Sequence, residues 1–167
     1  TTKIRQICFD VIEDIESSLD GETYDYIHSW VGRDFWKSLI EHKSVKETYL
    51  NTVQAAELRG DPHVYRFEFG GIVWERYRTG TRAAASVGAP FIGNDEARFV
   101  PMGVPELFIT RFAPADYMET VNSIGLPRYA KQYLAPNGKR VNLEIQSNPI
   151  SLCTQPGALR KGTRIAA

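Results

Sequence analysis

Two alternating segments separated by a pair of glycines constrain the fold of this chain more than any other feature. Residues 64–69 and 72–77 largely alternate between apolar and charged side chains, and Gly70-Gly71 stands between them. This pattern predicts a β-hairpin with a two-residue turn, because glycine accepts the positive φ angles that such turns need.

The turn also predicts which side chains share a face of the hairpin. Phe67 should lie opposite Trp74, on the face that Tyr65 shares. Arg66 should lie opposite Glu75 on the other face. One face of the hairpin is therefore expected to be aromatic and the other to be matched in charge.

Helical periodicity marks three segments in the N-terminal third. Apolar residues recur every three or four positions from Ile4 to Leu19, and Asp20-Gly21 marks the end of that helix. An apolar stripe over residues 34–41 predicts a second helix. Residues 44–47 have the form of a capping box, which predicts a third helix from Ser44 to about Leu58.

The remaining segments mix strands, loops and one more helix. Pro114 is the expected first-turn residue of a helix that ends at Gly125. The small, unpatterned residues 79–94 predict a mobile or functional loop. Strands are expected at residues 24–30, 107–112, 129–133, 141–146 and 150–153, with a turn at Asn137-Gly138. This mixed order predicts the α+β class, as a single unit over residues 1–167.

The charge balance argues against a protein that binds nucleic acid through its net charge. Twenty basic and twenty acidic residues give a formal charge of zero. Residues 1–30 nevertheless carry seven acids against two bases, and residues 126–167 carry seven bases against one acid. Either these two regions fold back on each other within one chain, or the acidic patch of one copy meets the basic patch of another.

The cysteines and the N-terminus bear on the origin of the chain. Cys8 and Cys153 lie in apolar runs and are expected to be free thiols of a cytoplasmic protein. No apolar run approaches the roughly 20 residues of a membrane-spanning helix. The chain starts at Thr1 and enters a helix almost at once, so we expect it to be a piece of a longer polypeptide, monomeric or weakly associated by itself.

The sequence offers little that resembles an active site. His28, His42 and His63 lack the spacing of metal ligands, and the chain has no nucleophile elbow and no phosphate-binding loop. We therefore expect no catalytic residue, no metal and no cofactor. A hydrolase-like enzyme that uses His28 or His63 with a nearby carboxylate stays an alternative.

A nucleic-acid-binding module is a second alternative, because aromatic residues on an open sheet can stack on bases. It would need the aromatic face of the hairpin and the basic C-terminal residues to share one exposed surface. The cations concerned are Arg160, Lys161 and Arg164, for which a solvated tail is the other interpretation.

The C-terminal half carries a distinctive order of short motifs. From Arg98 onward these are Phe-x-Pro-x-Gly-x-Pro, Ala-Pro-Ala-Asp, Gly-Leu-Pro-x-Tyr-Ala-Lys and Gln-Ser-Asn-Pro. This order resembles the C-terminal half of the major capsid protein E family of lambda-like tailed phages. Residues 34–49 and 71–78 are similar to further segments of that family, so the resemblance spans most of the chain.

The resemblance implies a tailed-phage major-capsid fold (Hong Kong 97-type), with the axial domain and part of the peripheral domain in this chain. The N-terminal arm, the extended loop and the spine helix would lie upstream. It also implies a structural protein of a phage or prophage that self-assembles into the icosahedral head shell around double-stranded DNA. Such a protein is found in the virion, and in the host cytoplasm before assembly.

The resemblance implies partners and structural residues as well. The partners would be other copies of the protein in hexamers and pentamers, scaffold, portal and decoration proteins, and packaged DNA through non-specific contact. The residues to which it gives assembly or structural roles are Arg98, Pro101, Gly103, Pro105, Pro114, Asp116, Asn122, Gly125, Pro127, Tyr129, Gln146, Asn148 and Pro149.

Overall fold

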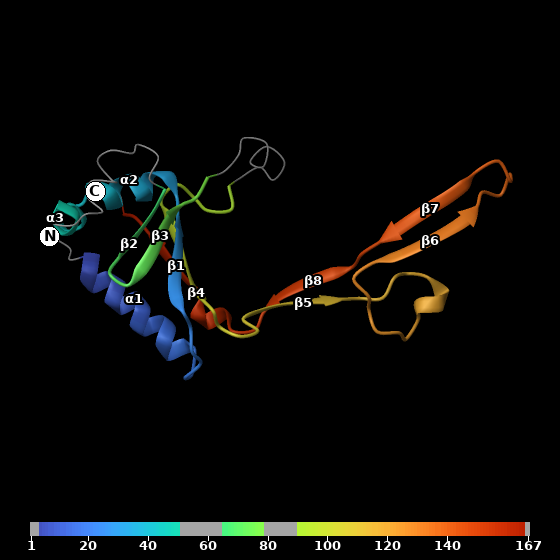
Figure 1. Ribbon diagram of the computed structural model, residues 1–167, viewed down its shortest axis with the longest axis horizontal. Coiled ribbons are helices and arrows are strands. Elements are labelled where there is room, and N and C mark those ends of the chain that lie inside the picture. Colours follow the sequence, from blue (N-terminus) through green and yellow to red (C-terminus); the bar gives the residue numbers. More distant parts are fainter. Residues whose placement is uncertain (1–3, 51–64, 79–89, 166–167) are drawn as a thin grey trace. The chain divides into compact units, whose positions relative to one another are not determined.

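A computed structural model of the chain describes residues 4–50, 65–78 and 90–165 (Figure 1). These residues form two compact units. Unit 1 comprises the chain up to Pro105 together with the residues from Gln155 onward, and unit 2 comprises Glu106–Thr154. The sequence predicted a single α+β unit over residues 1–167 and no boundary near residues 105 and 154.

Unit 1 is built on a five-stranded sheet with the strand order β2-β3-β1-β4-β9. Strand β1 lies in the middle, parallel to β3 and antiparallel to β4. The strands are β1 (Tyr26–Val31), β2 (Arg66–Phe69), β3 (Ile72–Arg76), β4 (Glu96–Met102) and β9 (Arg160–Thr163). Strands β4 and β9 were not predicted from the sequence, and together they supply one side of the sheet.

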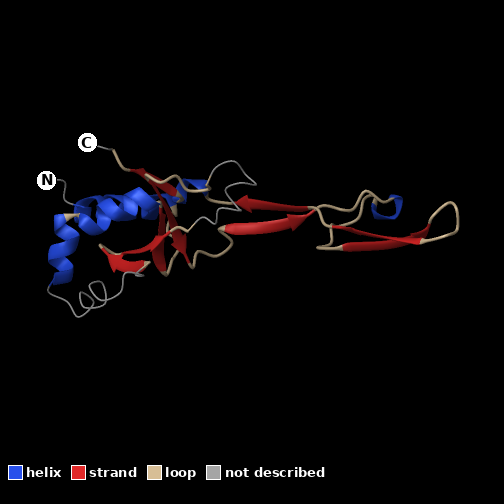
Figure 2. Cartoon of the chain, turned by 90° about the horizontal axis from the view of Figure 1, so that it is seen from above, coloured by secondary structure: helices blue, strands red, loops and turns tan. Residues whose placement is uncertain are grey.

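Helices cover one face of this sheet. Helix α1 (Ile4–Ser18) buries Cys8 and Ile15 against it, and α2 (Arg33–Glu41) packs on the same face. In α2 the ring of Trp36 lies 5.1 Å from that of Phe67. Mixed helix and sheet agrees with the predicted α+β class. All α-helices of the described residues belong to unit 1, and the helical turn that Figure 2 colours blue in unit 2 is a 3-10 turn.

The predicted third helix exists, but its cap is not the expected one. Helix α3 runs from Lys43 to Leu50, so Ser44 lies inside the first turn rather than before it. The backbone N–H of Ser44 donates to Nδ1 of His42 at 3.2 Å, and His42 has an extended backbone conformation. His42 therefore has the position and the acceptor of an N-cap residue. The prediction of Ser44 as the cap was wrong.

The predicted hairpin is confirmed in its register. Phe67 pairs with Trp74 and Arg66 with Glu75. Phe67, Phe69 and Trp74 are buried beneath the helices. Tyr65 differs, because it precedes β2, is exposed, and lies under the Arg78 guanidinium at 5.0 Å.

Unit 2 consists of two short antiparallel ribbons and a loop. Strand β5 (Phe108–Phe112) pairs with β8 (Pro149–Cys153), and β6 (Tyr129–Leu134) pairs with β7 (Val141–Gln146). These strands confirm the predictions for residues 107–112, 129–133, 141–146 and 150–153. Gly138 has a φ of 65° in the turn between β6 and β7, where Asn137-Gly138 was expected.

The predicted helix from Pro114 to Gly125 is wrong. Only a 3-10 turn, η1 (Met118–Thr120), forms in this segment, because Tyr117 has an extended backbone. The backbone N–H of Asp116 is bound by the side-chain oxygen of Gln146, and Asn122 has a φ of 59°. The backbone of Tyr117 and Asn122 is therefore not helical, and Gln146 of β7 holds the segment as a loop. We call residues 113–128 the unit 2 loop.

Some expectations fall outside the described residues. These are the helix beyond Leu50, His63, and most of the loop at 79–94. A further 3-10 turn, η2 (Pro156–Ala158), leads from unit 2 into β9. None of the helices in the described residues has both the length and the apolar character needed to cross a bilayer.

Candidate functional site

The histidines of the hydrolase hypothesis do not form a catalytic arrangement in the described residues. His28 Nε2 lies 3.1 Å from Oε2 of Glu75, and its ring packs 4.4 Å from that of Trp30. Within the described part of the chain, no serine, threonine or cysteine side chain hydrogen-bonds to His28, so a nucleophile is missing from the pair. His42 is the N-cap residue of α3, and His63 lies outside the described residues.

Burial dominates the electrostatics of His28. The residue is 5% exposed, and the desolvation of its side chain lowers the pKa of His28 below the ordinary 6.5. The Arg66 charge adds to this lowering of the pKa, and Glu75 opposes it. His28 is thus a largely buried imidazole of the sheet face opposite α1.

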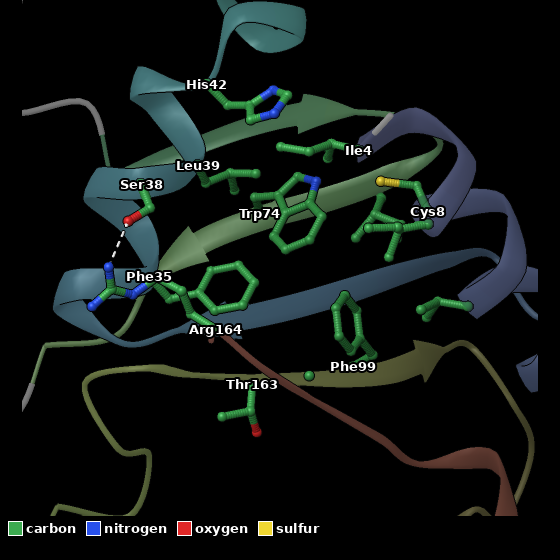
Figure 3. A pocket seen from close by; sticks show the side chains of 14 residues that line it. Ile4, Cys8, Phe35, Ser38, Leu39, His42, Trp74, Phe99, Thr163 and Arg164 are labelled. Atoms are coloured by element: carbon green, nitrogen blue, oxygen red, sulfur yellow. Dashed lines mark hydrogen bonds between the residues drawn. The ribbon is translucent and has the colours of Figure 1, made fainter. Parts of the chain in front are cut away.

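An apolar pocket lies between the helices and the sheet of unit 1 (Figure 3). Its volume is about 290 Å³, and Cys8, Leu39, Trp74 and Phe99 are among its lining residues. At its margin Nη1 of Arg164 donates to the hydroxyl of Ser38 at 3.2 Å. Burial raises the pKa of Cys8 to about 11, which keeps its sulfur a neutral thiol rather than a nucleophilic thiolate.

Metal binding has no support in the described residues. Within residues 4–50, 65–78 and 90–165, no group of three or more His, Cys, Asp or Glu side chains gathers as a metal site would require.

The nucleic-acid hypothesis is wrong for the aromatic hairpin, because Phe67, Phe69 and Trp74 are buried in the core. The basic C-terminal residues are also engaged with carboxylates. Arg160 lies 3.8 Å from Asp14 of α1, Lys161 lies 2.5 Å from Glu96, and Arg164 lies 2.6 Å from Asp95. The Arg160 contact joins the basic C-terminal region to the acidic N-terminal helix within one chain.

Four of the residues singled out by sequence lie at or near the end of β4. Arg98 pairs with Glu96 at 2.9 Å, and Pro101 is fully buried. Gly103 has a φ of +87°, and a Cβ atom there would clash with the Asp25 carboxylate. Pro105 is the last residue of this part of unit 1. This Pro-x-Gly-x-Pro motif therefore shapes the exit from the sheet.

The other predicted residues converge in unit 2, where they hold the unit 2 loop. Asn148 Nδ2 donates to the carbonyl oxygen of Pro114 at 2.9 Å. This bond links the segment that follows β7 to the start of the unit 2 loop. The backbone N–H of Asp116 donates to Oε1 of Gln146 at 3.3 Å. Both bonds join residues at least 30 positions apart in the chain.

The second half of the unit 2 loop is held in the same way. The Tyr129 hydroxyl accepts from the backbone N–H of Leu126 at 2.8 Å. The Ser147 hydroxyl donates to the carbonyl oxygen of Pro127 at 2.8 Å. A Cβ atom at Gly125 would clash with the carbonyl group of Phe112, so the chain passes close there. Asn122 has the positive φ of a left-handed turn within the unit 2 loop. Pro149 lies opposite Phe112 in the β5–β8 ribbon.

One pair in this region was not predicted from the sequence. Lys131 Nζ lies 2.7 and 2.8 Å from the two carboxylate oxygens of Glu119, and 4.9 Å from the centre of the Tyr117 ring. The bond from Lys131 lowers the pKa of Glu119. The only sequence signal was Lys131 in the Gly-Leu-Pro-x-Tyr-Ala-Lys motif, which gave no indication of its partner.

Comparison with known proteins identifies the family. A family model described as phage major capsid protein E matches residues 1–164. The major capsid protein of Pseudomonas phage KPP10 is 31% identical over 139 residues, which cover 77% of this chain and 40% of that protein. This chain thus spans well under half the length of that relative. The match over residues 1–164 confirms the resemblance read from the motifs, and the chain belongs to the phage major capsid protein E family.

Proposed function

We propose that this chain is part of the structural subunit of an icosahedral phage head, and that many copies assemble into the shell that encloses double-stranded DNA. The match of the phage major capsid protein E model over residues 1–164 is the observation that carries the proposal. The role is one of building surfaces rather than catalysis, and neither comparison favours a hydrolase.

The different secondary structure of the two units supports a finer assignment. We propose the Hong Kong 97-type fold, in which unit 1, with its helix-covered sheet, is the axial domain. Unit 2, with its ribbons and loop, would then be the part that returns to the peripheral domain. The N-terminal arm, the extended loop and the spine helix would belong to upstream sequence.

The proposed partners are first of all other copies of the same protein, in hexamers and pentamers. Scaffold, portal and decoration proteins are further proposed partners of this protein. Its proposed location is the virion, and the host cytoplasm before assembly. Arg160, Lys161 and Arg164 are poor candidates for contact with packaged DNA, because each is already paired with a carboxylate.

Electron microscopy tests the proposed function directly. The full-length capsid protein would be expressed alone and together with its neighbouring head genes. We expect regular icosahedral particles in at least one of these conditions. Dispersed, folded protein under every condition would contradict the proposal and leave the family match as evidence of fold only.

A further inference from the structure

The register of the β6–β7 ribbon sorts its side chains onto two unlike faces, because residues opposite each other in a ladder share a face and neighbours along a strand alternate. The apolar face consists of Ala130, Gln132, Leu134, Val141, Leu143 and Ile145. The polar face consists of Tyr129, Lys131, Tyr133, Asn142, Glu144 and Gln146.

The unit 2 loop attaches to the polar face. Glu119 binds Lys131, the backbone of Asp116 binds Gln146, and the backbone of Leu126 binds the Tyr129 hydroxyl. All three strand residues belong to the polar face. A two-stranded ribbon that had to be stable alone would place its covering loop on the apolar face, where burial contributes most.

The apolar face, by contrast, is not covered by any of the described residues. Its large side chains Leu134, Val141, Leu143 and Ile145 are 63 to 69% exposed, and the face carries no charged residue. Contiguous exposed apolar surface marks an interaction site, and the centre of a protein interface is depleted in charge. An isolated two-stranded ribbon is also only marginally stable, so a covering partner would stabilise it.

The charges around the ribbon point to the kind of partner. Lys139 and Arg140 lie at its turn, and neither makes an ion pair with any described residue. Another copy of this chain offers a surface of opposite charge. Helix α1 exposes Ile7 and Phe9, and it carries Asp10, Glu13 and Glu16 against Arg5, beside Asp14, which is paired with Arg160. A second copy therefore provides acidic and apolar surface together, as the ribbon requires.

We propose that the apolar face of the β6–β7 ribbon is an interface between copies of the capsid protein, closed by a neighbouring copy in the shell and open in the free subunit. The proposal rests on the proposed function, because it names the surface through which copies meet. In this arrangement the unit 2 loop is bonded to the polar face of the ribbon, and the apolar face is available to the neighbouring copy.

Paired substitutions in the full-length capsid protein, expressed with its head genes, test the interface. Leu143→Glu places a charge on the apolar face, and Tyr133→Glu removes an exposed large side chain from the polar face of the same ribbon. We expect Tyr133→Glu to give particles like the wild type. Leu143→Glu should accumulate as folded subunits, with particle yield lower by at least about tenfold. Equal yields from the two variants would overturn the proposal.

Thiol labelling tests the same surface without disturbing assembly. Leu143→Cys would be made in a background in which Cys153 and any other reactive cysteine of the full-length protein are replaced by serine, while Cys8 is buried in unit 1. A maleimide should label the free subunit rapidly and the assembled particle at least about tenfold more slowly, because burial blocks access to the thiolate.

Other outcomes of the labelling are equally decisive. Rapid labelling in both states would show that the face stays open in the shell. Slow labelling in both would show that another segment of the same polypeptide covers it. Either result overturns the second copy as occupant. If the wild type forms no particles, the proposed function fails and this proposal falls with it, whereas wild-type particles beside normal Leu143→Glu particles refute only the interface.

Discussion

At the scale of single residues, unit 1 contains a buried histidine whose protonation opposes folding. His28 lies on β1 between the Tyr26 and Trp30 rings, beside Glu75. Its desolvation lowers the pKa of the folded state below the 6.5 of an exposed imidazole. Between these two pKa values the unfolded chain binds more protons than the folded chain, so stability rises with pH there.

This linkage predicts a pH dependence of stability. The free energy of unfolding should fall as the pH is lowered from 7 through 6.5, and go on falling until the folded-state pKa is passed. His28→Gln should flatten this slope, because glutamine does not titrate. Urea denaturation of both proteins between pH 7 and 5 measures the effect. Parallel curves for the wild type and the variant would show that His28 contributes nothing to it.

At the scale of secondary-structure elements, the start of α3 depends on a cap that local pattern assigns to the wrong residue. The capping-box motif points to Ser44, yet α2 ends at Glu41 and leaves His42 alone in extended conformation between the two helices. The position before the first helical residue belongs to His42, so its ring nitrogen accepts the bond from Ser44.

Two substitutions separate these assignments. His42→Ala should lower the free energy of unfolding by about 1 kcal/mol, the typical cost of a lost N-cap. Ser44→Ala should change it by less than about 0.5 kcal/mol, as at an ordinary surface site. Urea denaturation at constant pH compares both variants with the wild type. A larger loss for Ser44→Ala than for His42→Ala would restore the serine as the cap.

At the scale of the whole molecule, the two units differ in the size of their hydrophobic cores. Unit 1 buries a continuous cluster that includes Ile15, Ile27, Ile72 and Trp74. In unit 2, where every residue is described, the buried hydrophobic residues are Leu107, Ala115 and Ala135. Unit 2 therefore derives little stability from its own packing and more from hydrogen bonds of the loop, which suits a part completed by assembly.

This contrast predicts uneven hydrogen exchange in the free subunit. Amides of β6 and β7 should exchange at least about tenfold faster than amides of β1 and β3, because local opening is easiest where few apolar contacts are lost. Exchange followed by mass spectrometry on the unassembled full-length protein measures this difference. Equal protection of β6 and β7 on the one hand and of β1 and β3 on the other would mean that unit 2 is as stable as unit 1 before assembly.

The sequence by itself determined the elements whose hydrogen bonds are local. The Gly70-Gly71 turn specified the register of Phe67 and Trp74, and apolar periodicity specified α1. The ordered motifs from Arg98 to Pro149 identified the family. These features are readable because the residues that define each one lie within a few positions of each other, or recur as a pattern along the chain.

Only the tertiary structure decided the rest. Strand β9 exists because residues 160–163 pair with β4, some sixty positions earlier. The segment after Pro114 is a loop with an extended backbone at Tyr117, held by bonds to Gln146 and Asn148, which lie at least 30 positions further along the chain. The exposure of the apolar face of β6–β7 is likewise a result of the tertiary structure. The unit 2 loop binds Lys131 on the polar face and not the apolar face, on which Leu143 lies. Such choices depend on competition between distant partners, which no local pattern in the sequence records.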